Sequence, residues 1–159
     1  MTATPLFKKL NFKNHEQILV LNPPAEFEPE LYAIKNFAVV ETDIENIDEI
    51  EFVLAFVKDP NAINVLSSKI DEKLKGDGLV WFAYPKKTSK KHTSEISRDT
   101  GWEILGKYGF DSVRHVAIDT DWSALRFRKV EFIKTMKRRT DFAMTEEGKQ
   151  KTQNVGSKK

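Results

Sequence analysis

Six short segments rich in apolar residues are separated by polar stretches along the chain. Their lengths and their content of β-branched and aromatic residues favour β-strands over helices. Most of them have no internal polar position, which is typical of strands covered on both faces in a parallel sheet. We therefore expect strands at residues 17–21, 37–42, 52–57, 79–84, 112–118 and 122–130.

Helix signals fill the intervals between these segments. Thr4 and Asp59 each precede a proline, and a capping residue followed by proline predicts a helix start. The helix after Asp59 has the clearest pattern, and it should end in a basic turn followed by Gly76. Ser97 predicts the start of a further helix, which internal glycines weaken. We therefore predict four helices. A short one begins at Pro5, and the others cover residues 25–35, 60–76 and 97–109.

Strands that alternate with helices indicate an α/β protein with helices on both faces of a mostly parallel sheet. The expected fold is a Rossmann-like three-layer sandwich. The polar corner at residues 119–121 predicts an antiparallel hairpin between the last two strands. Alternation along 122–130 predicts that one face of the last strand is half exposed to solvent. This domain should span residues 1–133, followed by a basic, largely disordered tail at 134–159.

Composition narrows the class of protein. A chain of 159 residues with 40% hydrophobic residues can bury one core, and no stretch is long and apolar enough to span a membrane. The absence of cysteine excludes disulfides, thiolate metal sites and thiol catalysis, and it fits a reducing compartment. The net charge of +2 is small, so the distribution of basic residues matters more than their total. We expect a soluble cytoplasmic protein.

The apolar strand at 79–84 runs into Pro85 and then into a loop with four lysines. Ligands of open α/β sheets bind outside the carboxyl ends of the strands, where this loop should lie. A helix that starts at Ser97 would add unpaired N–H groups and a partial positive charge. We predict that an anionic small molecule or an acidic protein surface is held by Lys86, Lys87, Ser89, Ser97 and Arg98. The alternative is a solvated lysine loop that serves solubility.

Two further basic residues, Arg126 and Arg128, fall on one side of the last predicted strand. In one interpretation they extend the basic surface, because guanidinium groups bind phosphates and carboxylates through paired hydrogen bonds. In the other, which we favour, they pair with Asp99, Asp119 or Asp121 and stabilise the hairpin.

Catalytic and metal-binding motifs are not recognisable in the chain. His15, His92 and His115 are scattered without metal-ligand spacing, and neither a phosphate-binding glycine motif nor a nucleophile elbow occurs. We therefore expect no metal and no cofactor, and we identify no catalytic residue.

Nucleic-acid binding is suggested by the basic segment at 134–139, with Trp81, Phe82 and Tyr84 as stacking residues beside the lysines. These aromatic residues lie inside a strand that the hydrophobic pattern places in the core. Core packing explains them better, so we do not expect a nucleic-acid partner.

Four segments resemble a bacterial family known as domain of unknown function 3052. They are residues 5–13, 19–27, 78–90 and 117–128. The likeness covers residues 5 to about 130, and its second half is the specific part. The resemblance implies a bacterial cytoplasmic domain, but it implies no activity.

A fainter likeness connects the strand at 52–57, the helix after it and residues 74–81 to the second half of a class I S-adenosylmethionine methyltransferase. This resemblance implies the strand order 2-1-3-4-6-5, with the last strand inserted antiparallel. The glycine-rich cofactor loop of that family is replaced here by residues 22–26, whose two prolines remove N–H donors. Asn22 lies in this loop, and Glu41 falls about where a ribose-binding acid would lie. We favour a module that binds an anionic group, and a diverged methyltransferase-like enzyme is the alternative.

Overall fold

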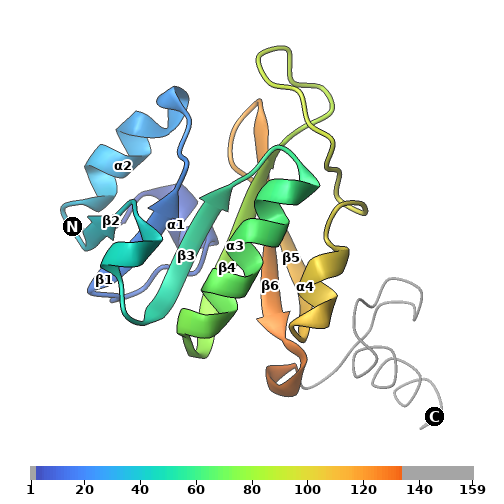
Figure 1. Ribbon diagram of the computed structural model, residues 1–159. Helices are drawn as coiled ribbons and strands as arrows, with labels where there is room; N and C mark the ends of the chain where they lie inside the picture. The colour runs from blue at the N-terminus through green and yellow to red at the C-terminus, as the bar shows by residue number, and fades with distance from the viewer. Residues whose placement is uncertain (1–2, 134–159) are drawn as a thin grey trace, which may run out of the picture.

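The computed structural model describes residues 3–133, so the predicted tail lies outside the described residues (Figure 1). Six strands form one sheet, and four short-to-medium helices and three 3-10 turns connect them. The strands are β1 (Gln17–Leu21), β2 (Val39–Glu41), β3 (Ile50–Phe56), β4 (Leu74–Pro85), β5 (Phe110–Ala117) and β6 (Trp122–Lys129). The helices are α1 (Pro5–Lys9), α2 (Glu28–Ile34), α3 (Pro60–Lys73) and α4 (Glu103–Lys107). The turns are η1 (Ala25–Phe27), η2 (Ile44–Asn46) and η3 (Val130–Phe132).

The strand order is β2-β1-β3-β4-β6-β5, which confirms the order implied by the methyltransferase resemblance. Strands β2, β1, β3 and β4 are parallel, and β6 is antiparallel to both of its neighbours, β4 and β5. The predicted hairpin between the last two strands is therefore confirmed. The carboxyl ends of β1, β3, β4 and β5 all meet at one edge of the sheet.

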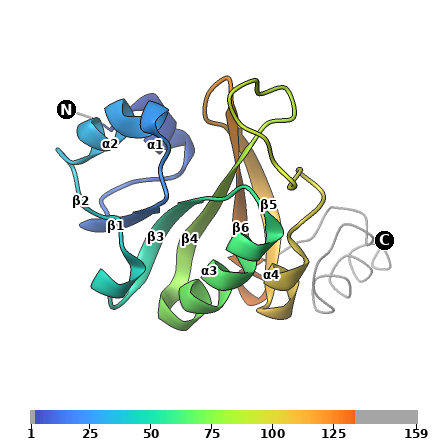
Figure 2. The same cartoon turned by 45° about the horizontal axis from the view of Figure 1, so that its top comes forward.

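Helices cover both faces of the sheet, with α1 and α2 on one side and α3 and α4 on the other (Figure 2). On the first face Phe7 of α1 packs in one apolar cluster with Trp81 and Trp122. The Nε1–H of Trp81 donates to the carbonyl oxygen of Leu10 at 3.0 Å, which ties α1 to the central strand. The three-layer Rossmann-like α/β prediction is confirmed.

Helix α3 begins as the sequence predicts but ends earlier. The Asp59 carboxylate accepts a hydrogen bond from the amide N of Ala62 at 2.8 Å, and Pro60 occupies the first helical position. The helix stops at Lys73 rather than near Gly76, because Leu74 is already extended and pairs with Ile50 of β3. Strand β4 is longer than predicted, since its polar first residues carry no apolar signal.

The predicted helix from Ser97 is wrong over its first half, because only Glu103–Lys107 is helical. The Ser97 amide donates to the Thr100 carbonyl, and the Ser97 carbonyl accepts from the Trp102 indole at 2.8 Å. Gly101 has a φ of 102°, which a helix does not allow. Residues 97–101 therefore form a tight turn, and no helix N-terminus lies at Ser97.

Two strand predictions also need correction. Strand β2 starts at Val39 rather than at residue 37, because the amides of Phe37 and Ala38 bond back to the Ile34 carbonyl at the end of α2. Strand β6 does not alternate along its whole length: its first four residues, 122–125, are all buried, and exposure begins at Arg126. In the described part of the chain, no helix is long and apolar enough to cross a bilayer.

Candidate functional site

Three loops meet at the carboxyl edge of the sheet. The β1 loop at residues 22–27 approaches from one side, the long loop at 86–102 follows β4, and the turn at 118–121 joins β5 to β6. Figure 1 shows the second and third of these projecting together beyond the ends of the strands. This edge brings together polar side chains that are far apart in the sequence.

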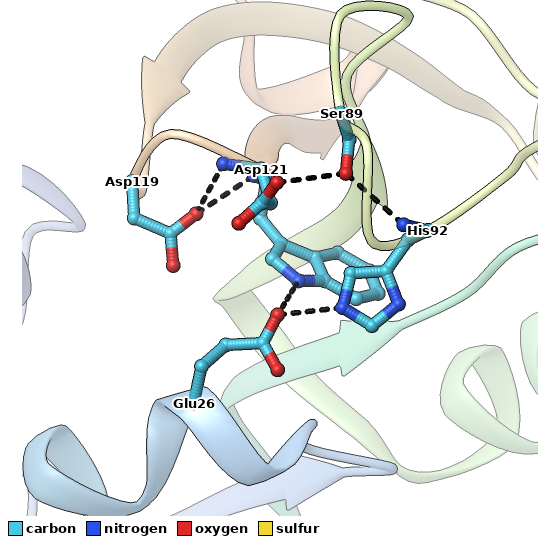
Figure 3. Close-up of polar contacts among 6 residues, drawn as sticks. Glu26, Ser89, His92, Asp119 and Asp121 are labelled. Carbon is cyan, nitrogen blue, oxygen red and sulfur yellow. Dashed lines mark hydrogen bonds and ion pairs between the residues drawn. The ribbon is translucent and has the colours of Figure 1, made fainter.

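Glu26, His92 and Trp122 connect the three loops, and we call them the edge bridge (Figure 3). The Glu26 Oε2 lies 2.6 Å from His92 Nε2 and accepts the indole N–H of Trp122 at 3.0 Å. The His92 and Trp122 rings pack with centroids 4.9 Å apart. The hydrogen bond from Trp122, then a backbone hydrogen bond and the interactions with His92, lower the pKa of Glu26 to about 2 against the opposing effect of burial. Glu26 is therefore held as a carboxylate.

Ser89 and two aspartates fix the loop around the edge bridge. The Ser89 hydroxyl donates to Asp121 Oδ1 at 2.8 Å and accepts the backbone N–H of His92 at 3.1 Å. Asp119 Oδ1 accepts the amides of Asp121 and Trp122, each at 2.8 Å, which closes the hairpin turn. These bonds hold the lysine loop against the β5–β6 turn.

A serine, a histidine and carboxylates in one network invite comparison with a catalytic triad, but their connections differ from one. The imidazole of His92 bonds to Glu26, and Ser89 reaches only the main chain of His92. Ser89 instead donates its proton to Asp121, so no imidazole is placed to activate the hydroxyl. The network is suited to holding loops together.

A second set of side chains lies on the other face of the same edge, and we call Tyr84, Lys86, Arg98 and His115 the cationic group. The hydroxyl of buried Tyr84 lies 3.3 Å from Nε2 of exposed His115. Burial, then Arg98 and Lys86, lowers the pKa of His115. Burial raises the pKa of Tyr84, while Arg98 opposes this change and Asp99 adds to it. Both cations therefore act on the Tyr84–His115 pair.

The structure divides the predicted anion-binding residues between different surroundings. The charges of Arg98 and Lys86 both act on His115, and Lys87 is exposed. Ser89 belongs to the loop contacts around the edge bridge. Ser97 shares a hydrogen bond with the Thr100 hydroxyl at 2.7 Å.

The other candidate residues lie elsewhere. Arg128 pairs with Asp77 through contacts as short as 2.6 Å, so the predicted pairing of Arg128 with an aspartate of the hairpin is corrected. Arg126 lies beside it on the sheet, and its buried Nε has no hydrogen-bond partner within the part of the chain that the structure describes. Glu41 ends β2, half-buried, and Asn22 is exposed with a φ of 54°.

Sequence reasoning missed Glu26, Trp122 and His115 as site residues. Glu26 and Trp122 are 96 positions apart, so no local spacing could connect them. The signal available for these two residues was their position at the carboxyl edge, because Glu26 follows β1 and Trp122 begins β6. Within residues 3–133, no group of three His, Asp or Glu side chains is arranged to hold a metal ion. The basic segment at 134–139 lies outside the described residues, so nucleic-acid binding stays untested.

Several solved structures superpose on this chain, and S-adenosylmethionine-dependent methyltransferases are among them. A SAM-dependent methyltransferase from Aquifex aeolicus superposes with a TM-score of 0.52 at 13% identity, covering 77% of this chain and 87% of that one. The Methanococcus jannaschii fibrillarin pre-rRNA processing protein gives 0.49 at 16% identity, covering 80% and 70%. A putative S-adenosylmethionine-dependent methyltransferase from Listeria monocytogenes gives 0.49 at 11%, covering 78% and 97%. The chain has a methyltransferase-like fold.

No family model and no curated protein sequence matches the chain. The resemblance to domain of unknown function 3052 therefore stays a prediction. At these identities, the structural likeness establishes the fold and not an activity.

Proposed function

We propose that this methyltransferase-like domain is a binding module that recognises an anionic group of a small molecule at the cationic group. The observation that carries the proposal is the contact of the Tyr84 hydroxyl with His115 Nε2, at a place where the charges of Arg98 and Lys86 both act on the imidazole. Among the ion pairs formed by the described residues, none involves Lys86 or Arg98. In the described part of the chain, neither cation is therefore paired with a carboxylate, and the nearest acidic influence on the group is the charge of Asp99, which acts on Tyr84.

The position supports binding as well as the chemistry does. Open α/β sheets take their ligands beyond the carboxyl ends of the strands, where Tyr84 is the penultimate residue of β4 and His115 lies near the end of β5. A phosphate or carboxylate there would accept hydrogen bonds from ammonium, guanidinium and hydroxyl groups, each strengthened by charge.

The edge bridge supports a role other than cofactor binding for the neighbouring β1 loop. Pro23 and Pro24 offer no N–H to a ligand, and the Glu26 carboxylate is already used by His92 and Trp122. A loop with these contacts is suited to covering the carboxyl end of β1. The cationic group is then the part of this edge that we propose for binding a ligand.

Histidine titration by NMR tests the binding proposal, with inorganic phosphate and citrate as probes. A bound anion favours the charged imidazolium, so we expect either probe to raise the pKa of His115 by about one unit. His15, which lies against Phe12 and Phe52, is an internal control that should not respond. The double variant Lys86→Gln, Arg98→Gln should abolish the response.

The matched control replaces Lys90 and Lys91, exposed residues of the same loop, with glutamine and keeps the loop's loss of charge equal. It should leave the His115 response intact. A His115 pKa that neither probe moves, or one that moves equally in both double variants, would contradict the proposal.

Methyltransferase activity is the second candidate, and the specific support for it is the sheet order together with the superposition on the Aquifex aeolicus enzyme. Glu41 at the end of β2 is the residue that would contact a ribose. Calorimetry with S-adenosylmethionine and S-adenosylhomocysteine checks this candidate. If the leading proposal holds, neither binds tightly; tight binding that Glu41→Gln weakens tenfold and Glu28→Gln does not would replace it.

A further inference from the structure

Three arginines lie together on the sheet face that carries α1 and α2, and we call Arg114, Arg126 and Arg128 the arginine cluster. Arg114 on β5 is directly opposite Arg126 on β6, and Arg126 pairs on its other side with Trp81 of β4. Arg128 follows two positions later on the same face, because side chains of a strand alternate. The cluster is next to the contact between α1 and the sheet, because Trp81, which pairs with Arg126, donates its indole N–H to the carbonyl of Leu10 at the end of α1.

The carboxylates near this cluster are gathered at one end. The guanidinium of Arg128 donates to the Asp77 carboxylate through its Nε and Nη2. Buried Asp111 lies opposite Arg128 in the β5–β6 register. Arg114 donates to Asn11 Oδ1 at 3.2 Å, which is a neutral amide. In the described part of the chain, Arg126 forms no ion pair, and its Nε is buried without a hydrogen-bond partner.

This arrangement costs stability in the free protein. Like charges directly opposite each other on neighbouring strands are destabilising, and Arg114 and Arg126 are such a pair. A guanidinium with a buried, unpaired N–H adds the penalty of desolvation. Burial and the charge of Arg128 lower the pKa of Arg126, Asp77 opposes this change, and Arg114 acts in the same direction as Arg128. Residues that cost stability without a local compensation often belong to binding sites.

We propose that the arginine cluster binds a phosphate-type oxyanion, such as the diphosphate part of a small molecule. An oxyanion over Arg114 and Arg126 would neutralise the two facing charges and accept paired hydrogen bonds from planar guanidinium groups. Asn11 holds the Arg114 side chain in place from the end of α1. This site is on the opposite face of the sheet from the cationic group, so it is independent of the function proposed above.

Charge argues against the chain's own carboxyl-terminal segment as the occupant. Residues 134–159 contain eight lysines and arginines against three aspartates and glutamates. A segment with this excess of positive charge would be repelled by three guanidinium groups. The complementary partner is an anion from outside the chain.

Calorimetric titration with sodium pyrophosphate tests the proposal in the background Lys86→Gln, Arg98→Gln, so that the cationic group contributes nothing. We expect this background protein to bind pyrophosphate. Adding Arg126→Met or Arg114→Met should weaken binding at least tenfold, since each removes a charged pair of hydrogen bonds. Adding Lys107→Met, which removes an exposed cation on α4, should change the affinity less than twofold.

Urea unfolding separates a binding role of Arg126 from a structural one. Methionine fills a similar volume without the unpaired N–H, so Arg126→Met should unfold at the same or a higher urea concentration. If that variant does not fold, Arg114→Met carries the binding test. Absence of pyrophosphate binding in the background protein, or equal affinity in the Arg114→Met and Lys107→Met proteins, would overturn the proposal.

Discussion

At the scale of single residues, the edge bridge shows how a glutamate can be held as a carboxylate by partners from other parts of the fold. Glu26 follows two prolines in a loop, and nothing in its neighbourhood along the chain distinguishes it. Its carboxylate gains its two side-chain partners only through the fold, because β6 places Trp122 and the lysine loop places His92 within hydrogen-bond distance. The depressed pKa of Glu26 is thus a consequence of tertiary structure and predicts how stability depends on pH.

Replacing Glu26 with glutamine tests this pH dependence. A group whose pKa falls from 4.5 to about 2 on folding stabilises the protein fully above about pH 4.5 and loses this effect as the pH falls through 2. We expect wild type to exceed Glu26→Gln by about 1.5 to 3 kcal/mol in free energy of unfolding at neutral pH, the range for hydrogen bonds to charged groups. The difference should vanish near pH 2, measured by urea unfolding at a series of pH values.

The control for this measurement is Glu72→Gln, at an exposed position of α3. It should differ little from wild type at any pH. A Glu26→Gln deficit that stays the same from pH 7 to pH 2 would show that the carboxylate charge is not what stabilises the bridge.

At the scale of elements, caps and apolar periodicity act locally, and the features that they control were predictable. The Asp59 cap and Pro60 place the start of α3 where the sequence predicts it. The end of α3 is set by pairing of Leu74 with Ile50 on a neighbouring strand, which no local signal reports. The turn at 97–101 likewise depends on the Trp102 indole, which takes the Ser97 carbonyl away from a helix.

The cap of α3 can be tested alone. Asp59→Ala removes the acceptor for the Ala62 amide and should lower the free energy of unfolding by about 1 kcal/mol, within the usual range for lost caps. The measurement is urea unfolding at neutral pH. Asn64→Ala, an exposed position inside the same helix, should leave stability unchanged or slightly raised. Equal effects of the two substitutions would show that the cap does not stabilise the helix.

At the scale of the whole molecule, the order of strands decides which side chains become neighbours. Insertion of β6 between β4 and β5 places Trp122 beside Pro85 and lets its indole reach the β1 loop. The same insertion sets Arg126 between Trp81 and Arg114. Both the edge bridge and the arginine cluster therefore depend on one topological feature, the insertion of β6 between β4 and β5.

The sequence was sufficient for the six strands, the layers and, through the methyltransferase resemblance, the order of the sheet. It also selected Lys86 and Arg98, because a basic loop after a buried strand must leave at the carboxyl edge. It could not supply His115 as their neighbour, since Tyr84 and His115 are 31 positions apart and meet across β6. Nor could it reveal that Asp77 binds Arg128, or that Arg126 Nε has no hydrogen-bond partner among residues 3–133, because both depend on which strands become neighbours.

The central position of β6 has a consequence for biosynthesis. A ribosome makes residues 74–85 and 110–117 before residues 122–129, yet β4 and β5 meet only through the strand made last. Until that strand leaves the exit tunnel, the edge of β4 that pairs with β6 over residues 80–85 has no partner for its amides and carbonyls. The nascent chain should therefore stay incomplete, and in need of protection from aggregation, until nearly all of the domain has been translated.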